Sequence, residues 1–412
     1  MNTEMRPPAQ PHGFATRAVH AGVAPSLHGT HPTSVPIYAS STFVSENAAA
    51  LDDVLGGTRP GYVYGRYANP TVAALEAAVA SLEGAAATVA FGSGMAALHA
   101  ALLLCDLKPG AVVLASNDLY GASHTLLESL LGPFGVETRF VDMTDLPAVE
   151  TALTANASVR AVLFEPVSNP LVKVVDVLQV CTLARAAGAL TVVDGTFTPP
   201  PLLQPLAHGA DIVMHSATKY FGGHGDATGG LVSVADPDRE ARLRQIARLG
   251  GAMLSPFEAF LIGRGIKTLA LRVRQQCENA ATLAAWLRTH PRVGAVHYPG
   301  LSDHPQHALA ARLLGTSGFG AMLAFEIDGA GRDEVFSFLD ALRLIVPATT
   351  LGDVESEVSY PLISSHRGWT ADQLSRAGIT PGLVRLSAGI EDVDDLIADL
   401  DQSLLGHSLA RV

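Results

Sequence analysis

One lysine, Lys219, has the sequence surroundings of a reactive amine. It is one of only four lysines among 412 residues, and the apolar run Asp211–Met214 leads into it through two hydroxyl residues. Apolar runs of this length are typical of buried strands. A lysine at the mouth of a buried strand loses hydration, which lowers its pKa and leaves a neutral amine for Schiff-base chemistry. The alternative is a surface lysine whose ammonium reaches water.

A second candidate feature is the turn Gly92-Ser-Gly94, which lies between a short apolar strand and the helical stretch Met95–Leu104. Glycines let a backbone approach an anion, and a helix N-terminus presents free N–H groups, so the pattern predicts a phosphate cradle. It is neither a Walker motif nor a dinucleotide fingerprint, because no Gly-Lys-Ser/Thr follows and the spaced third glycine is absent. A tight turn that binds nothing would have the same sequence.

A third feature is Asp194, which ends the apolar run Leu190–Val193. A buried carboxylate needs a partner, and a pyridinium nitrogen would supply one. The alternative is a helix N-cap. Pro199–Pro201 makes a helix at this point less favourable.

The spacing of these features indicates one cofactor. Lys219 follows Asp194 by 25 residues (219 − 194), about one helix and one strand, so the two residues should end neighbouring strands. A phosphate cradle, a carboxylate for a ring nitrogen and a Schiff-base lysine together predict pyridoxal 5′-phosphate (PLP).

The composition limits the class of protein. Net charge is −12 with no basic block, which argues against nucleic acid as a partner. Three widely spaced cysteines show no disulfide or zinc pattern, so we expect no metal and a reducing cytoplasm. The first 13 residues lack the apolar core of a signal peptide, and no apolar stretch is long enough to span a bilayer.

Alternating strand and helix signals from Thr71 onward predict an α/β fold with a mainly parallel sheet. We expect residues 1–65 to form an ordered arm, 66–265 an α/β domain, and 266–412 a smaller α+β domain. The expected strands are Thr88–Phe91, Ala111–Ala115, Glu137–Val141, Ala161–Phe164, Leu190–Val193 and Asp211–Met214, then Val293–His297, Met322–Ile327 and Leu383–Ser387. Between the two sets, Pro256–Arg288 carries only helical signals.

A series of motifs resembles the cystathionine γ-synthase/γ-lyase and methionine γ-lyase family of PLP enzymes. The resemblance runs from about Phe14 to Leu404 in the family's order, and its motifs are Tyr62–Thr71, Gly92–Met95, Leu119–Gly121, Glu165–Pro170, Val193–Phe197, Ser216–Lys219, Arg264–Leu269 and Val384–Glu391. It implies the PLP-dependent transferase fold of the aspartate aminotransferase type.

The resemblance also implies a role for each motif residue. Lys219 would carry the cofactor and move protons, and Asp194 would pair with the ring nitrogen. Tyr120 would stack on the ring and assist at the leaving group. The expected phosphate ligands are Gly94, Met95, Ser216 and Thr218 with Tyr64 and Arg66 of a neighbouring subunit, and the expected substrate-binding residues are Glu165, Asn169, Thr350 and Arg385.

The shared phosphate site implies a homo-oligomer, and family members are usually tetramers built as dimers of dimers. The substrate would be a small amino acid. Ala122 replaces the cysteine found in methionine γ-lyases, and Thr349 replaces a glutamate of the cystathionine enzymes. We expect γ-elimination on a γ-substituted L-amino acid such as cystathionine or homocysteine, giving 2-oxobutanoate and ammonia. The alternative is γ-replacement, as in cystathionine γ-synthase or O-acylhomoserine sulfhydrylase.

Overall fold

The computed structural model describes residues 12–22, 30, 32–314 and 317–406. Its larger sheet has the order β1-β7-β6-β5-β4-β2-β3. All neighbouring strands in this sheet are parallel except β7, which runs antiparallel to both β1 and β6. The strands are β1 (Ala87–Phe91), β2 (Val112–Ser116), β3 (Glu137–Val141), β4 (Val159–Phe164), β5 (Leu190–Asp194), β6 (Ile212–Ser216) and β7 (Gly230–Val234). The mainly parallel α/β sheet is therefore confirmed.

Helices cover this sheet, and two apolar clusters bury its two faces. Helix α3 begins where the Asn69 side chain accepts a hydrogen bond from the Thr71 backbone and ends at Gly84 in the left-handed conformation. The helices up to the end of this region are α1 (Phe14–His20), α2 (Ala48–Leu55), α3 (Pro70–Glu83), α4 (Gly94–Leu103), α5 (Gly121–Thr125), α6 (Leu146–Thr154), α7 (Val177–Ala186), α8 (Glu240–Gly250) and α9 (Pro256–Ile266).

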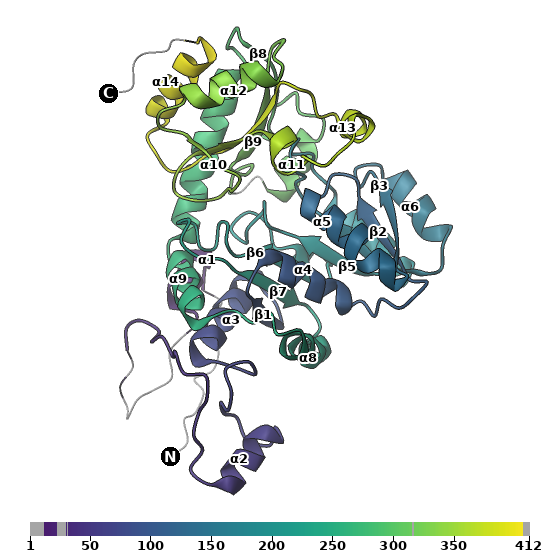
Figure 1. The fold of residues 1–412 in the computed structure, drawn as a ribbon, viewed down its shortest axis with the longest axis vertical. Coiled ribbons are helices and arrows are strands. Elements are labelled where there is room, and N and C mark those ends of the chain that lie inside the picture. The colour runs from purple at the N-terminus through teal and green to yellow at the C-terminus, as the bar shows by residue number, and fades with distance from the viewer. Residues whose placement is uncertain (1–11, 23–29, 31, 315–316, 407–412) are drawn as a thin grey trace.

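A second sheet has the order β10-β11-β12-β9-β8 and is antiparallel except for the β10–β11 pair. It lies at the opposite end of the molecule from α2 (Figure 1). Its strands are β8 (Val293–His297), β9 (Met322–Ile327), β10 (Val346–Pro347), β11 (Glu357–Ser359) and β12 (Leu383–Ser387), and its helices are α10 (Leu269–Leu287), α11 (His307–Leu313), α12 (Arg332–Ala341), α13 (Ala371–Ala377) and α14 (Val393–Leu404).

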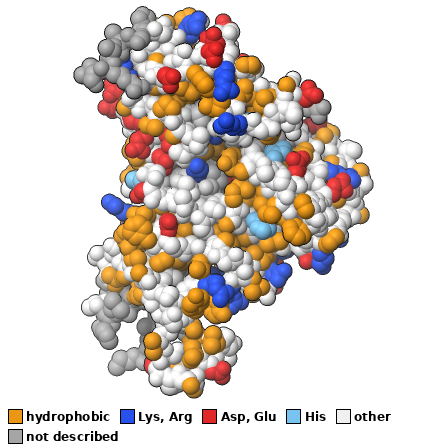
Figure 2. All heavy atoms as spheres, viewed as in Figure 1, with side chains coloured by type: hydrophobic (Ala, Val, Ile, Leu, Met, Phe, Trp, Pro, Cys, Tyr) orange, Lys and Arg blue, Asp and Glu red, His pale blue; other side chains and the backbone are white. Residues whose placement is uncertain are grey.

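The N-terminal segment projects from the body of the protein. Figure 1 shows that the chain around α2 extends away from both sheets, and Figure 2 shows apolar side chains on this projection. Val44 is 99% exposed and Leu55 is 56% exposed, which is unusual for large apolar residues. Residues 1–11, 23–29 and 31 of the expected arm lie outside the described residues.

The described part of the chain contains no helix long and apolar enough to cross a membrane. Cys105, Cys181 and Cys277 are buried free thiols. Within the same described residues, no cluster of three histidine, cysteine or acidic side chains has the arrangement of a metal site.

Candidate active site

The ends of β5 and β6 place the chemically active residues beside one another. Asp194 is the last residue of β5 and pairs in register with Met214 of β6, and Lys219 follows the end of β6 by three residues. Both line one cavity of about 260 Å³. The expectation that Asp194 and Lys219 end neighbouring strands is therefore met.

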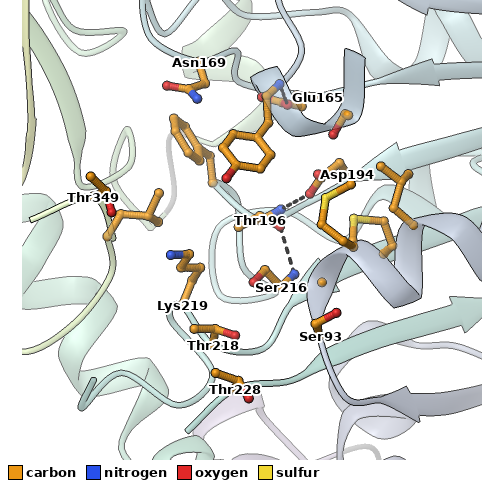
Figure 3. Close-up of a pocket in the computed structure, with 18 of the residues that line it drawn as sticks. Ser93, Glu165, Asn169, Asp194, Thr196, Ser216, Thr218, Lys219, Thr228 and Thr349 are labelled. Carbon is orange, nitrogen blue, oxygen red and sulfur yellow. Dashed lines mark hydrogen bonds between the residues drawn. The ribbon is translucent and has the colours of Figure 1, made fainter. Parts of the chain in front are cut away.

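Most of the residues expected at the site surround this cavity. Figure 3 shows the Lys219 side chain directed into a space bordered by Thr349, Asn169, Thr196 and Ser216. The expected residues among its lining are Gly94, Met95, Tyr120, Glu165, Asn169, Asp194, Ser216, Thr218, Lys219 and Arg385.

The amine of Lys219 is held in a desolvated position. Its Nζ donates a hydrogen bond to Thr350 Oγ1 at 2.8 Å. Burial lowers the pKa of Lys219, and the nearby Arg385 cation lowers it further, while Asp353 and Glu357 act in the opposite direction. The lowered pKa of Lys219 is the direction of shift that the sequence predicted.

Asp194 is held by the turn that follows β5. Its Oδ1 accepts the backbone N–H of Thr196 at 3.0 Å, and Thr196 Oγ1 in turn accepts the N–H of Ser216 at 3.0 Å (Figure 3). No helix begins here, so the helix-cap alternative is wrong, although the carboxylate does hold a local turn. Burial raises the pKa of Asp194, and these hydrogen bonds oppose the rise.

Arg385 and Asn169 form a polar group at the cavity wall. Arg385 Nη1 donates to Asn169 Oδ1 at 3.0 Å, and Nη2 donates to the Thr350 carbonyl at 3.1 Å. Arg385 Nε is buried and has no partner among the described residues. A guanidinium held in this way can present further donors to a carboxylate. Burial lowers the pKa of Arg385 to about 10.

Glu165 and Thr350 form hydrogen bonds to other residues expected at the site. Glu165 Oε1 accepts the backbone N–H of Tyr120 at 2.7 Å and thereby fixes the start of α5. Burial raises the pKa of Glu165 well above its ordinary value, and the Asp194 charge raises it further. Thr350, expected to bind substrate, is not among the residues that line the cavity; its hydroxyl and carbonyl accept hydrogen bonds from Lys219 and Arg385.

The glycine-rich turn is closely packed against the end of β6. Helix α4 begins at Gly94, and the Ser93 side chain caps it by accepting the Ala96 N–H. A Cβ atom on Gly94 would lie 2.8 Å from Ser216 Cβ, so only glycine leaves this space open. The space beside a helix N-terminus with two hydroxyl residues, Ser216 and Thr218, suits a phosphate.

Tyr64 and Arg66 do not line this cavity. Arg66 lies on the protein surface, where it donates to the Arg248 carbonyl at 3.0 Å and its guanidinium packs over the rings of Tyr64 and Tyr67. The expected role of Tyr64 and Arg66 at a neighbouring subunit's site stays a prediction.

Sequence reasoning missed several lining residues. Phe197 belongs to the recognised Val193–Phe197 motif, so its aromatic ring was a usable signal. The sequence around Thr228 gave no such signal, because Thr228 lies beside the cavity only where the chain turns back into strand β7. The other lining residues not predicted are Ser93, Leu98, Ser123, Thr196, Met214 and Leu351, whereas Thr349 stands out in the sequence as the replacement of a glutamate.

The cavity fits PLP on three independent observations. Asp194 is a partly buried carboxyl to which no cationic side chain of the described residues is hydrogen-bonded, and a ring N–H⁺ would pair with it. Gly94 lines the cavity at the start of α4 beside Ser216, where a phosphate is expected, and Lys219 supplies the amine. The residues present therefore match the donors and acceptors of this cofactor.

Comparisons with known proteins agree with this assignment. Residues 15–405 match the family described as "Cys/Met metabolism PLP-dependent enzyme". The chain is 44% identical over 397 residues to the L-methionine γ-lyase of Pseudomonas putida, covering 95% of this chain and 97% of that protein. It is 41% identical over 389 residues to the cystathionine γ-lyase of Bacillus subtilis, covering 94% and 98%.

Two solved structures also resemble this chain closely. The crystal structure of cystathionine γ-synthase from Xanthomonas oryzae pv. oryzae in complex with cystathionine superposes with a TM-score of 0.90 at 40% identity, covering 96% of this chain and 99% of that chain. Cystathionine γ-lyase from Lactobacillus plantarum, complexed with L-serine, gives 0.89 at 36% identity, with coverages of 96% and 99%.

Proposed function

Because the chain belongs to the Cys/Met metabolism family of PLP-dependent enzymes, we propose that it is a γ-lyase acting on a γ-substituted L-amino acid. The observation that carries the proposal is Lys219, whose desolvated amine lies in one cavity with Asp194 and Arg385. The similarity to two kinds of γ-lyase supports elimination as the reaction.

PLP supplies the electron sink that stabilises negative charge at the substrate's α-carbon. Lys219 would hold the cofactor, Asp194 would keep its ring nitrogen protonated, and Gly94, Met95, Ser216 and Thr218 would surround its phosphate. The ring of Tyr120 would lie against the cofactor ring.

The chain's own residues then orient the substrate and move its protons. Arg385 and Asn169 bind the α-carboxylate, which fixes the α-carbon in front of Lys219. The Nζ of Lys219 would remove the α-proton, a second proton would then leave the β-carbon, and that electron pair would expel the γ-substituent, to which the Tyr120 hydroxyl would donate a proton. Reprotonation of the remaining four-carbon unit and its hydrolysis by one water molecule would give 2-oxobutanoate and ammonia beside the released substituent.

A substrate panel tests the proposal. Methionine, cystathionine, homocysteine, canavanine and acylated homoserines are incubated with the holoenzyme, with and without a thiol. We expect 2-oxobutanoate from at least one substrate without added thiol. Formation of a thioether alone would instead establish γ-replacement, the reaction named for the cystathionine γ-synthase structures.

A matched pair of lysine variants tests the role of Lys219. Lys219→Ala should abolish 2-oxobutanoate production and the visible absorbance of lysine-bound cofactor. Lys108→Ala is the control, because Lys108 is an exposed lysine that pairs with Asp106 on the surface. Retention of the visible band in Lys219→Ala would place the attachment at another residue.

We further propose a dimer, assembled into a tetramer, in which residues 1–65 form an arm across the neighbouring subunit. The exposed Val44, Tyr64 and Arg66 support it. Residues 66–265 and 266–412 would be the two domains, and the buried free thiols fit a reducing cytoplasm. Light scattering tests the assembly, and Arg66→Ala should weaken PLP binding if the arm completes the phosphate site.

A further inference from the structure

An ion pair between Lys173 and Asp118 joins two of the loops that border the cavity. Lys173 Nζ donates a hydrogen bond to Asp118 Oδ2 at 3.0 Å. The Asp118 side chain is 8% exposed and the Lys173 side chain is 28% exposed, so the pair is largely removed from water. An exposed ion pair contributes little, whereas removing one partner of a buried pair leaves a charge without compensation. Neither residue lines the cavity itself.

Each partner of this ion pair lies on the loop of a different cavity residue. Asp118 follows the end of β2 and precedes Tyr120 by two residues (120 − 118). Lys173 follows Asn169 by four residues (173 − 169), in the loop between β4 and α7. Strands β2 and β4 are parallel neighbours, so both loops leave the same edge of the sheet. The ion pair therefore fixes the loop of Tyr120 against the loop of Asn169.

The turn that carries Asn169 is closed by its own hydrogen bonds. The Ser168 N–H donates to the Lys173 carbonyl at 2.9 Å, and the Lys173 N–H donates to Ser168 Oγ at 3.2 Å. Val167 and Val174 pair as an antiparallel bridge at the base of the turn. Since Lys173 belongs to this closed turn, a displacement of Lys173 also displaces Asn169.

The loop of Tyr120 has a second contact with the loop of Asn169. Glu165 Oε1 accepts the Tyr120 N–H at 2.7 Å. Glu165 lies before Asn169 in the chain and Lys173 lies after it, so the two contacts hold the turn on both sides. Glu165 lines the cavity, whereas Lys173 and its partner do not. The ion pair can therefore be removed without changing the cavity lining.

We propose that Lys173 and Asp118 are positioning residues, whose ion pair sets the separation between Asn169 and Tyr120. The inference rests on the proposed function, in which Asn169 binds the α-carboxylate and Tyr120 acts at the γ-substituent. These two groups lie a fixed number of bonds apart in the substrate, so the two loops must keep a matching separation. A misplacement of about 1 Å at a reacting group can lower a rate by about 100-fold.

The experiment compares the wild-type holoenzyme with Lys173→Met, Asp118→Asn and the double variant. The first measurement is the affinity for free glycine, which has an α-carboxylate and no γ-substituent, followed by the visible absorbance of the bound cofactor. The second is the visible circular dichroism of the cofactor, which depends on how its ring lies against the protein. The third is kcat for 2-oxobutanoate formation from the best substrate of the panel.

Each single variant should bind free glycine about tenfold more weakly and lower kcat about tenfold, with a changed circular dichroism. The double variant should lose no more than the worse single variant, because the two side chains act through one contact. Lys173→Arg should recover most of the loss, since a guanidinium also pairs with a carboxylate.

Arg312→Met is the matched control. Arg312 Nη2 on α11 lies 3.4 Å from Asp176 Oδ2, which is three residues beyond Lys173 (176 − 173) in the same loop. This ion pair does not involve the loop of Tyr120, so its loss should leave the glycine affinity and the circular dichroism unchanged. Partial misfolding would reduce the number of active sites without changing the affinity of the remaining ones. The affinity therefore distinguishes positioning from a loss of stability.

An unchanged glycine affinity and circular dichroism in Lys173→Met would overturn the inference, as would losses that add in the double variant. If Lys173→Met does not fold, Asp118→Asn gives the same test, because it keeps the side-chain size and removes the charge. A wild type that makes 2-oxobutanoate, with variants that bind free glycine equally well, refutes the inference alone. A wild type that makes none, with variants that show the coupled changes, refutes the proposed function alone.

Discussion

Replacing Arg385 with lysine should separate carboxylate binding from the rest of the reaction. Arg385→Lys keeps the positive charge but removes the planar fork that bonds Asn169 Oδ1 and the Thr350 carbonyl. A hydrogen bond to a charged group contributes about 1.5–3 kcal/mol. Loss of one such bond to the substrate carboxylate therefore predicts a decrease in kcat/KM of roughly 10- to 150-fold.

The decrease should appear mainly in KM, because the carboxylate is bound before and during the proton transfer. The assay measures kcat and KM for the best substrate of the panel and for the corresponding amine without an α-carboxylate. The wild type should prefer the amino acid strongly, and Arg385→Lys should lose most of that preference.

Arg272→Lys is the matched control. Arg272 is 4% exposed and bonds the Gly265 carbonyl and Thr268 Oγ1, whereas Arg385 is 6% exposed. Both variants should lose thermal stability, because each leaves buried acceptors unpaired. Only Arg385→Lys should lose carboxylate discrimination. An equal loss in both variants, or an unchanged preference in Arg385→Lys, would refute the assignment of Arg385.

Three further changes have definite expected outcomes. Asp194→Asn should lower kcat by about 100-fold or more with a smaller change in KM, since the ring nitrogen loses its anionic partner; steady-state kinetics would show this. Gly94→Ala should weaken PLP binding in fluorescence titrations because its Cβ would meet Ser216, whereas Gly250→Ala has open space and should not. Glu357→Gln should reduce a loss of stability that the wild type shows as the pH rises from about 4.5 to about 8, because the raised pKa of Glu357 lets the folded state retain a proton that the unfolded state releases; thermal midpoints at pH 5 and pH 8 test it.

The buried strands of the larger sheet could be predicted because they are continuous apolar runs between helical segments. Strand β7 (Gly230–Val234) was missed because it follows a glycine-rich loop and returns antiparallel, outside the strand–helix alternation. Because β7 was not predicted, the predicted strand before Lys219 stops at Met214 instead of Ser216. Ser216 belongs to β6 through its pairing with Gly230, a partner that local sequence does not show.

The helical region before the second sheet was also only partly predicted. Pro256–Arg288 contains no strand, as expected, but it forms two helices, α9 and α10, separated at Lys267 and Thr268. The short strands β10 and β11 were not predicted, because two or three residues give no measurable alternation.

The site was predictable where a residue's chemistry and its strand end coincide, as at Lys219 and Asp194. It was not predictable where the role depends on packing across the chain. Asp353 and Glu357 look in the sequence like ordinary loop acids, and only the tertiary fold brings them beside Lys219, more than 130 positions earlier. A buried carboxyl pair has no local sequence pattern that distinguishes it from a solvated one.

The structure also changes where substrate discrimination should be sought. In the proposed reaction Lys219 would perform the same proton transfer whichever γ-substituent leaves, so its geometry would not select among substrates. Thr350 is occupied by Lys219 and Arg385, whereas its neighbour Thr349 and also Ser123 line the cavity with neutral hydroxyls. The two cavity carboxyls, Glu165 and Asp194, are engaged by backbone N–H groups. Since Asp194 is assigned to the cofactor ring and Glu165 accepts the Tyr120 N–H, the hydroxyls at 123 and 349 are the lining groups that we expect to meet the γ-substituent, and they favour substituents that are uncharged at the distal end.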